Sequence, residues 1–493
     1  MKKKYILITI TLLNIFVSNA EEKENHIKLT LREAITLAQL QSVDAAVAIN
    51  ELKTAYWEYR THQADQLPEV NFTGKLPSYN NSYSRNTLSE TSSYIQNNWL
   101  GLNGEMSIDQ NIALTGGTVS LKTSLDFTRQ LGKGTHNEYM SVPFGITLTQ
   151  PIFGVNNLKW NRRIEPVRYK RAKAAYIESV EDITVISIQY FFNLLHAKED
   201  LAISIQNHEN AIKLLDIAIA KRKIGHISES ELMQLELSAL QAKGAVTEKQ
   251  LNLNTNMFLL RSFLGLSEQD IIEPVVPESV PSFRLEYNRV LEKAHENNSF
   301  AQKIIQNQLN ADFEVAKAKG NQRNIELFAS VGYTGKDITF EKTYNHLKAN
   351  QIVEIGVSIP ILDWGKRKGK VKVAESNREV ILSRNRQEQM NFNQNIFLLV
   401  EKFNNQADQL EIAEEADIIA GKRYNTSIET FMIGKINILD LNDAQNSKDK
   451  AKLKHIEELH KLWNYFYNIR SITLYDFIAE RNLDADFESI IKQ

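Results

Sequence analysis

The feature that most constrains this chain is a pair of matched segments. A strand-like run around Pro151 recurs around Pro360, and a break around Gly225 recurs around Gly434. Each proline lies 74 positions before its glycine, and the residues between them follow an almost unbroken helical pattern. At ~1.5 Å per residue, such a helix would be on the order of 100 Å long. Two equal rods, each entered from a strand, indicate a long tube rather than an enzyme.

The first 20 residues have the pattern of a secretory signal peptide. Lys2, Lys3 and Lys4 precede a short apolar run, and small residues lead up to Ala20. The alternative is an N-terminal membrane anchor, for which the run is short. Cleavage would change the net charge from −2 to −5, because three lysines are lost. The charge gives no indication of nucleic acid binding, and a chain without cysteine has no disulfides or thiol chemistry.

Alternation of apolar and polar residues before each proline predicts β-strands. Within each run, the apolar residues all lie on odd or all on even positions: Val119, Leu121, Leu125 and Phe127; Phe144, Ile146 and Leu148; Ile325, Leu327, Val331 and Tyr333; Val353, Ile355, Val357 and Ile359. This period suits a strand with lipid on one face and water on the other, although an ordinary half-buried sheet would show it too. No later stretch is apolar enough for a spanning helix, so a membrane crossing would require a closed β-barrel. The export signal and the rods favour the barrel.

A proline-rich stretch divides the chain into two repeats. Residues 273–283 hold three of the nine prolines, which favours an extended linker. We expect a mixed α/β membrane protein whose repeats cover 21–272 and 284–493. Each repeat should contain a helix, strands and a long helical hairpin, with the strands and hairpin at about 70–150 and 156–264, then at about 325–361 and 366–478.

The expected strands cannot close a barrel within one chain. Membrane barrels begin at about eight strands, whereas the two alternating pairs supply about four. Three copies giving twelve strands is the simplest solution, which predicts an obligate oligomer. More residues lie between Val70 and Pro151 than between Ile325 and Pro360, and the surplus contains a turn pattern at Leu114–Thr118. This surplus, within residues 100–130, indicates either an extra hairpin or a structured external loop.

Over nearly its whole length, the chain resembles the TolC-type outer-membrane efflux proteins. The most specific pieces are two strand-to-helix junctions and two turns, in matched order: Thr149-Gln150-Pro151-Ile152-Phe153, Ser358-Ile359-Pro360-Ile361-Leu362-Asp363-Trp364-Gly365, Ile224-Gly225 through Leu232, and Ile433-Gly434 through Leu441. The resemblance implies a homotrimer with a twelve-stranded barrel in the lipid of the outer membrane. A long α-helical coiled-coil barrel would continue from it across the periplasm. Such ducts dock onto a periplasmic adaptor protein and an inner-membrane pump, and they catalyse no covalent reaction.

The resemblance also places acidic residues around the narrowest opening, at the periplasmic turns. The matching positions lie six and nine residues past the turn glycine: Glu231 in the first half, and Asp440 and Asp443 in the second. Such a ring would favour cations and would titrate as a coupled set. Helix capping offers another explanation, because Ser228 precedes Glu231 and Asn437 precedes Asp440 by three residues. Asp443 lies beyond the first helical turn, where capping does not reach.

The residue pair that often holds the closed state in this family is replaced by other residue types in this chain. Where the family often has a tyrosine and an arginine beside the second glycine, this chain has Phe431 and Ile436. Either apolar packing holds the gate, or Lys435 and Asn437 substitute. At the junctions, Trp160 and Trp364 stand with Pro151 and Pro360 among basic residues, which fits an aromatic belt at a membrane interface.

The leading interpretation is an outer-membrane exit duct for drugs, dyes or metal ions, driven by a proton-coupled pump. The alternative is the same duct serving an ATP-driven type I protein secretion system. A pore-free periplasmic coiled-coil scaffold is a third class, against which the alternating strands argue. We expect no enzyme, cofactor, metal or nucleic acid site. His455 and His460 are five residues apart, unlike a zinc-binding pair on a helix, and we expect them at the surface.

Overall fold

The computed structural model describes residues 25–86, 93–132, 134–223, 225, 227–278, 283–322, 324–358, 361–433 and 435–492. The predicted signal peptide, Pro360 and Gly434 lie outside the described residues, as does part of the proline-rich linker. The chain divides into two compact units. The first combines the chain up to Ala46 with Glu181–Arg284 and Lys402–Asn468, and the second combines Val47–Val180, Leu285–Glu401 and Ile469 onward.

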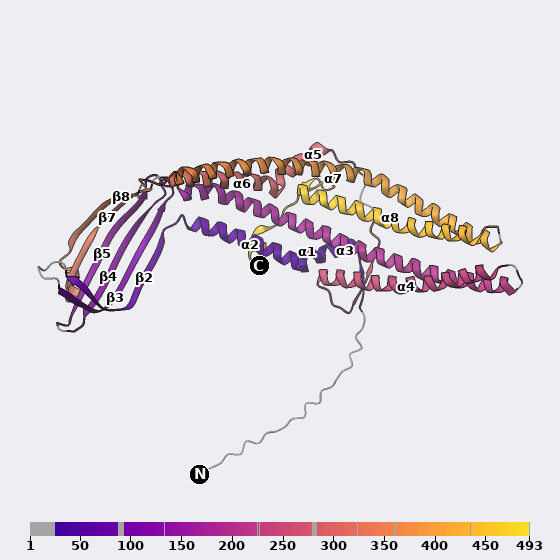
Figure 1. The fold of residues 1–493 in the computed structure, drawn as a ribbon, viewed down its shortest axis with the longest axis horizontal. Coiled ribbons are helices and arrows are strands. Elements are labelled where there is room, and N and C mark those ends of the chain that lie inside the picture. The colour runs from indigo at the N-terminus through magenta and orange to yellow at the C-terminus, as the bar shows by residue number, and fades with distance from the viewer. Residues whose placement is uncertain are drawn as a thin grey trace, which may run out of the picture. The chain divides into compact units, whose positions relative to one another are not determined.

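The second unit contains one antiparallel sheet of six strands, which lie side by side in Figure 1. Their order is β2-β3-β4-β5-β7-β8, with bounds Glu69–Asn86, Ser93–Ile112, Gly117–Gln130, His136–Pro151, Asn324–Asp337 and Lys348–Ser358. The expectation of about four strands is wrong, because the first repeat supplies four and the second supplies two. The surplus residues of the first repeat therefore form strands of the sheet, not an external loop.

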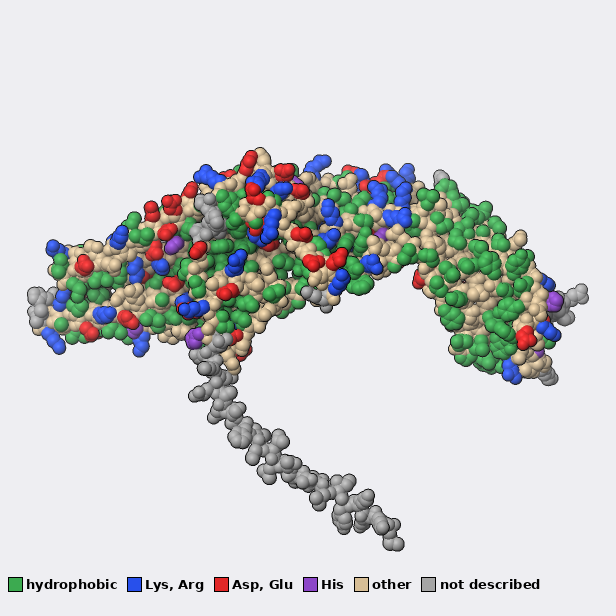
Figure 2. All heavy atoms as spheres, turned by 180° about the vertical axis from the view of Figure 1, so that it is seen from behind, with side chains coloured by type: hydrophobic (Ala, Val, Ile, Leu, Met, Phe, Trp, Pro, Cys, Tyr) green, Lys and Arg blue, Asp and Glu red, His purple; other side chains and the backbone are tan. Residues whose placement is uncertain are grey.

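The register of the sheet separates an apolar face from a polar face. One row runs across five strands as Val70, Ile108, Leu121, Ile146 and Val331, each at least 37% exposed. The neighbouring row is mostly polar, running Glu69, Asp109, Ser120, Thr147, Ser330 and Ile352. In Figure 2, hydrophobic side chains gather over the strands, and charged side chains are few there. An exposed apolar face opposite a polar face is the pattern of a strand between lipid and water.

The helices repeat in length to the residue. The first set is α1 (Leu31–Gln41), α2 (Val43–Ala64), α3 (Asn157–Lys223) and α4 (Glu229–Leu264). The second set is α5 (Tyr287–Asn297), α6 (Ser299–Gly320), α7 (Lys366–Met432) and α8 (Ile438–Thr473). In both sets the lengths are 11, 22, 67 and 36 residues. The two halves of the chain are therefore the same helical unit built twice.

Short elements complete the described fold. In the first unit, β1 (Asn25–Leu29) pairs in parallel with β6 (Asp270–Pro274). In the second unit, η1 (Glu341–Tyr344) lies between β7 and β8. The chain then continues after α8 through β9 (Tyr475–Asp476), β10 (Arg481–Asn482) and α9 (Phe487–Lys492). Among the described residues, none of the helices has both the length and the apolarity needed to cross a membrane.

Local sequence signals explain where several helices begin and end. Thr30 and Glu33 form a capping box at the start of α1, and Asn298 caps α6 through its side chain. Gly265 ends α4 in the left-handed conformation, at φ 68°. On α3, Ile188, Phe191, Phe192, Leu194 and Leu195 are fully buried and form part of the core of the first unit.

Candidate functional site

The turn between α3 and α4 is built around Gly225 and a capping box. Gly225 has φ 76°, which favours glycine, and its N–H donates to the Arg222 carbonyl at 3.0 Å. The carboxylate of Glu231 accepts from the Ser228 N–H at 2.7 Å and from the Ser228 hydroxyl at 2.8 Å. These hydrogen bonds hold the pKa of Glu231 below its usual value. The Glu231 carboxylate is therefore ionised and bound to its own turn.

The turn between α7 and α8 leaves Asp440 in a different position. The Asn437 side chain accepts from the backbone N–H of Asp440 at 2.9 Å, so Asn437 caps α8 without using the Asp440 carboxylate. Asp440 is exposed. Of the three predicted acids, Asp440 therefore has a carboxylate that neither caps its helix nor pairs with a cation of the described chain.

Asp443 is paired with a cation that the sequence interpretation missed. The carboxylate of Asp443 lies 2.6 Å from the Arg423 guanidinium, which also donates to the Ser447 hydroxyl at 3.3 Å. Arg423 is on α7, so this ion pair joins the two helices of one hairpin. A signal was present in the sequence, because Arg423 and Asp443 lie at similar distances on either side of Gly434. In an antiparallel hairpin, such positions come together.

Phe431, a predicted gate residue, packs into a small apolar cluster. The buried residues Tyr424, Leu441 and Ala444 form its centre, and Leu214, Ile428 and Phe431 pack against them. The ammonium of Lys221 on α3 lies 5.4 Å from the centre of the Phe431 ring, a cation–π distance. The backbone N–H of Lys435 donates to the Thr430 carbonyl at 3.0 Å, and the Lys435 side chain is exposed. Ile436 is half-buried.

A set of polar residues next to this cluster connects α3 to the α7–α8 hairpin. We term it the interhairpin cluster, and its members are Asn207, Asn210, Tyr424, Lys448 and Asp449. Asn207 donates to Asp449 at 2.6 Å, and Asn210 donates to the Tyr424 hydroxyl at 3.0 Å. The Lys448 ammonium lies 3.2 Å from the Asp449 carboxylate and 4.7 Å from the centre of the Tyr424 ring. Burial raises the pKa of Tyr424, so its hydroxyl stays protonated. No periodic pattern in the sequence points to these contacts.

The junctions between sheet and helices keep their tryptophans in two environments. The Trp160 ring on α3 packs against Phe313, with a centroid distance of 5.8 Å, and Arg163 lies over it at 5.2 Å. Trp364 is 89% exposed and has φ 54°, in the left-handed region. Its neighbour Asp363 accepts from the Gly365 N–H at 3.0 Å. Pro151 ends β5, and Pro360 lies outside the described residues.

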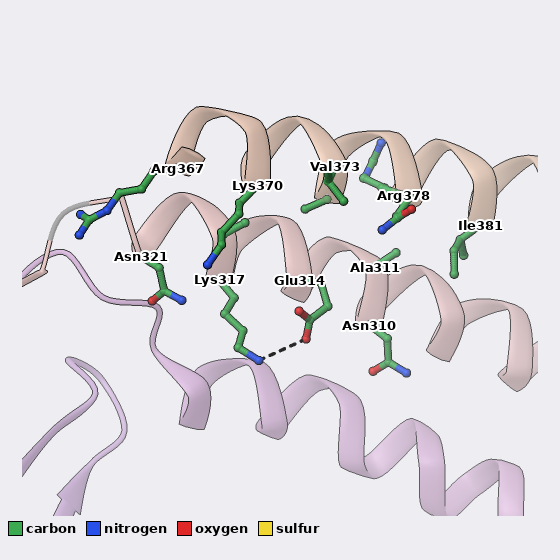
Figure 3. Close-up of a pocket in the computed structure, with 13 residues that line it drawn as sticks. Asn310, Ala311, Glu314, Lys317, Asn321, Arg367, Lys370, Val373, Arg378 and Ile381 are labelled. Atoms are coloured by element: carbon green, nitrogen blue, oxygen red, sulfur yellow. Dashed lines mark ion pairs between the residues drawn. The ribbon is translucent and has the colours of Figure 1, made fainter. Parts of the chain in front are cut away.

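A groove of about 620 Å³ lies between α6 and α7 in the second unit, close to the second junction (Figure 3). Its α7 side carries Arg367, Lys370 and Arg378, and on its α6 side Glu314 pairs with Lys317 at 3.5 Å. Arg378 also pairs with Asp312 at 2.5 Å. The described lining holds cations, amides, aliphatic side chains and one carboxylate, Glu314, which is engaged in the ion pair with Lys317.

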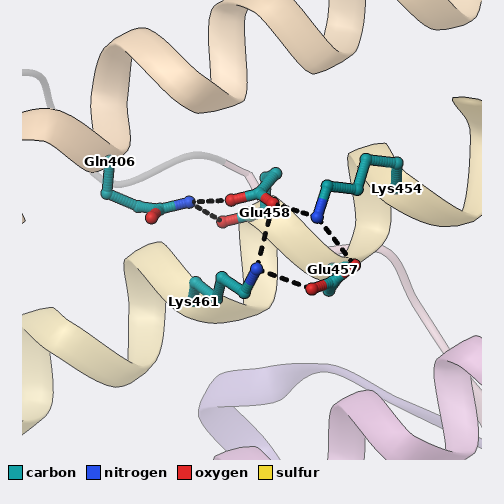
Figure 4. A network of polar contacts seen from close by, with 5 residues as sticks. All are labelled: Gln406, Lys454, Glu457, Glu458 and Lys461. Carbon is teal, nitrogen blue, oxygen red and sulfur yellow. Dashed lines mark hydrogen bonds and ion pairs between the residues drawn. The ribbon is translucent and has the colours of Figure 1, made fainter. Parts of the chain in front are cut away.

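A buried carboxylate fastens α7 to α8 (Figure 4). Glu458 is 5% exposed and lies 2.8 Å from Lys454 and 3.1 Å from Lys461, while Gln406 on α7 donates to it at 2.5 Å. Burial acts to raise the pKa of Glu458, but the hydrogen bonds from these three side chains outweigh burial and lower it. Glu457 pairs with the same two lysines. This cluster is structural, because its two carboxylates pair with its two lysines.

The expectation that His460 is a surface residue is wrong. The His460 ring stacks on Phe192 of α3 with a centroid distance of 4.8 Å, and its Nε2 is buried without a hydrogen-bond partner in the described structure. Burial lowers the pKa of His460 to about 4, so the ring is neutral at pH 7. The five-residue spacing excluded a zinc pair with His455, but spacing does not show which helix face is covered. The described residues contain no cluster of three potential metal ligands.

Together, these features define a class of protein. Along the chain, the strands of an antiparallel sheet with an exposed apolar face lead into two helical hairpins of equal length. The turns of these hairpins carry acids and apolar packing. This is the architecture of the outer-membrane efflux channels, in which a β-barrel adjoins a long α-helical barrel.

The chain belongs to the family of outer membrane efflux proteins, whose model matches residues 34–266 and 293–471. No curated protein matches the sequence.

Solved structures show the same fold at low identity. The CmeC outer membrane channel of Campylobacter jejuni is 14% identical with a TM-score of 0.67, and the match covers 94% of this chain and 88% of CmeC. The outer membrane protein VceC of Vibrio cholerae is 12% identical with a TM-score of 0.63, covering 90% and 95%. The MtrE outer membrane channel of Neisseria gonorrhoeae is 12% identical with a TM-score of 0.56, covering 92% and 91%.

Proposed function

We propose that this protein is the outer-membrane exit duct of a tripartite efflux system and works as a homotrimer. It receives small molecules such as drugs, dyes or metal ions from a periplasmic adaptor and a proton-coupled inner-membrane pump. The observation that carries this proposal is the sheet with one exposed apolar face and one polar face, whose strands lead along the chain into two helical hairpins. Each hairpin consists of one helix of 67 residues and one of 36 residues. A wall of this kind needs lipid outside and water inside.

The turns supply the selectivity of the proposed duct. Three copies of Asp440 would place three carboxylates around one opening, where they attract cations. Asp443 contributes less net charge, because Arg423 lies 2.6 Å from it, and Glu231 is held by its own cap. We assign the closed state to the packing of Phe431 together with the interhairpin cluster, because both join α3 to the α7–α8 hairpin. Opening requires these contacts to separate.

The test is a crosslinked pull-down of the tagged protein from membranes, followed by identification of its partners. Recovery of an adaptor with a proton-coupled pump supports the proposal, whereas recovery with an ATP-driven transporter supports type I secretion. Deletion of the adaptor gene should abolish the co-purified pump, which controls for chance capture. Recovery of the protein alone, as a water-soluble particle, would overturn the duct.

A further inference from the structure

The first repeat contains a segment that the second repeat lacks. The differences in residue number between equivalent helices show where this segment lies. α1 and α2 begin 256 residues before α5 and α6, whereas α3 and α4 begin 209 residues before α7 and α8. The first repeat therefore has 47 more residues between its second and third helices. β4 and β7 are both 14 residues long and stand in equivalent places, so the extra residues are the hairpin of β2 and β3.

The β2–β3 hairpin leaves the helices and returns to the same place. Glu69 at the start of β2 pairs with Asp109 near the end of β3. The side chains of Gln110 and Asn111 then donate to the carbonyls of Gln66 and Asp65, just after α2, at 3.1 and 3.2 Å. The chain could therefore pass from α2 directly into β4, as it passes from α6 into β7. The hairpin is an insertion that leaves the rest of the fold in place.

The inserted hairpin is part of the wall and continues both faces of the sheet. Phe72 and Met106 face each other on the apolar side and are 73% and 48% exposed. On the polar side, Asn103 of β3 donates to Asp126 of β4 at 2.5 Å. Glu105 lies 3.7 Å from Lys122 on the same side. A loop folded over the outside of a barrel would not share both faces with β4 in this way.

The outermost strands have one unpaired edge each. β2 and β8 end the strand order, and in the described structure no strand pairs with their outer sides. Within lipid every backbone N–H and C=O needs a partner, and six strands are too few to close on themselves. β2 begins just after α2, and β8 ends just before α7, so the two strands run in opposite directions. With 18 residues, β2 is long enough to pair with all 11 residues of β8.

We propose that β8 of one copy pairs with β2 of the next copy, so that three copies close a barrel of eighteen strands rather than twelve. This inference rests on the proposed function and names the partner of the sheet edges as a second copy of this chain. With strands ~4.8 Å apart and tilted by roughly 40°, eighteen strands give a backbone diameter of about 36 Å, against about 24 Å for twelve. The barrel of this duct is therefore wider than the family pattern implies.

The far end of the hairpin fits this placement. The last pair between β3 and β4 joins Trp99 to Gln130, whereas β2 and β3 continue to pair for six more residues on each strand. Apart from the exposed aromatic Tyr83, this extension carries polar contacts on both faces: Gln96 donates to Asn81 at 3.0 Å, and Asn97 donates to Ser84 at 2.8 Å. Tyr79, which is 62% exposed, lies at its base. An aromatic residue below a polar extension is the arrangement of a barrel rim that leaves the membrane.

Paired cysteines test which strand β8 meets, because the natural chain has no cysteine. We would combine Val353→Cys on β8 with a cysteine at position 70, 72 or 74 of β2, and separately at position 119, 121 or 125 of β4, all on the apolar face. Disulfides need Cα atoms about 4.4–6.8 Å apart, so they report adjacency. The control pair Val353→Cys with Ala329→Cys lies within one chain and should oxidise without a change in size.

We expect the β8–β2 pairs to give covalent dimers and trimers in outer-membrane fractions, with most of the protein linked at the best position. Linkage through β4, or no linkage by either set while the control oxidises, would overturn the inference. A variant lacking residues 69–115 keeps the test independent of any one pair: electron cryomicroscopy should count eighteen strands in the natural trimer and twelve in the variant. Absence of the natural chain from the outer membrane would instead overturn the proposed function.

Discussion

The Arg423–Asp443 ion pair offers a test in which two substitutions have opposite effects. Arg423→Gln leaves Asp443 unpaired, and Asp443→Asn leaves Arg423 unpaired. In the proposed trimer, each change alters the charge at the turns by three units, with opposite sign. The two side chains are 51% and 66% exposed, so the pair contributes only about 0.2–1 kcal/mol to stability. Both variants should therefore fold.

The expected effect follows from the charge. A unit charge about 10 Å from an ion in water contributes about 0.4 kcal/mol, and three contribute about 1.2 kcal/mol. At 0.1 M salt the Debye length is about 10 Å, so screening leaves roughly 0.4 kcal/mol. This changes the local cation concentration about twofold and the anion concentration about twofold in the opposite sense. Arg423→Gln should thus raise the cation-to-anion permeability ratio about fourfold, and Asp443→Asn should lower it by a similar factor.

The assay is the reversal potential of the reconstituted pore under a KCl gradient, measured at about 0.1 M and at 1 M salt. The shifts should disappear at 1 M salt, where the Debye length is about 3 Å. Arg289→Gln is a matched control, because Arg289 is similarly exposed and pairs with Glu480 at 3.0 Å outside the turns. Equal shifts in the same direction from Arg423→Gln and Asp443→Asn would refute the assignment of this pair to the pore.

Three further predictions concern the turns and the helices. Replacing Asp440 and Asp443 together with alanine should lower the cation preference about twice as far, in free energy, as Asp440→Ala alone; unchanged reversal potentials would mean that neither acid faces the opening. Asn207→Ala removes the hydrogen bond to Asp449 and should raise the single-channel open probability, whereas a pore that stays as closed as the natural one would exclude the interhairpin cluster from gating. For His460, the folded pKa of about 4 lies below the ordinary 6.5, so the unfolded chain binds more protons between these values and stability should fall by about 3 kcal/mol as pH drops through them. His460→Phe keeps the ring on Phe192 and should remove that part of the slope in thermal unfolding; parallel pH profiles for the two proteins would contradict the burial of His460.

Much of the helical architecture could be predicted from the sequence, because its signals are local. The apolar periodicity and the breaks at the turn glycines give two matched rods, and the capping box at Ser228 and Glu231 is visible in four residues. The partners of Asp443 and His460 could not be predicted in the same way. Arg423 lies across a hairpin, where its distance from the turn glycine is the one sequence signal that points to Asp443. Phe192 lies on a helix from the other repeat, so its contact with His460 depends on tertiary packing that no local pattern encodes.

The strand β2 is difficult to predict from the sequence because a β-bulge breaks its alternation of apolar and polar residues. Val70 and Phe72 lie on even positions, facing Ile108 and Met106, but the register shifts between Lys75 and Ser78. Beyond the shift, Tyr79 takes the odd position on the same face, opposite Leu100. A bulge adds a residue to one strand, so a search for a single parity finds two short runs of polar and aromatic residues instead of one strand.

The different geometric demands on the helical wall and on the β-sheet wall of the duct explain why the two repeats match in their helices but differ in their number of strands. In the proposed trimer, the hairpins of both repeats must reach the same turn region, so a change in the length of α3 without a matching change in α7 would separate Gly225 from its counterpart. A β-wall has no such restriction, since an added hairpin returns the chain to its starting edge and leaves the direction of the next strand unchanged. Insertion of two strands therefore widens the barrel while α3 and α7 stay at 67 residues. A single added strand would place the entry to α3 at the opposite edge of the sheet, which is why the surplus consists of a pair.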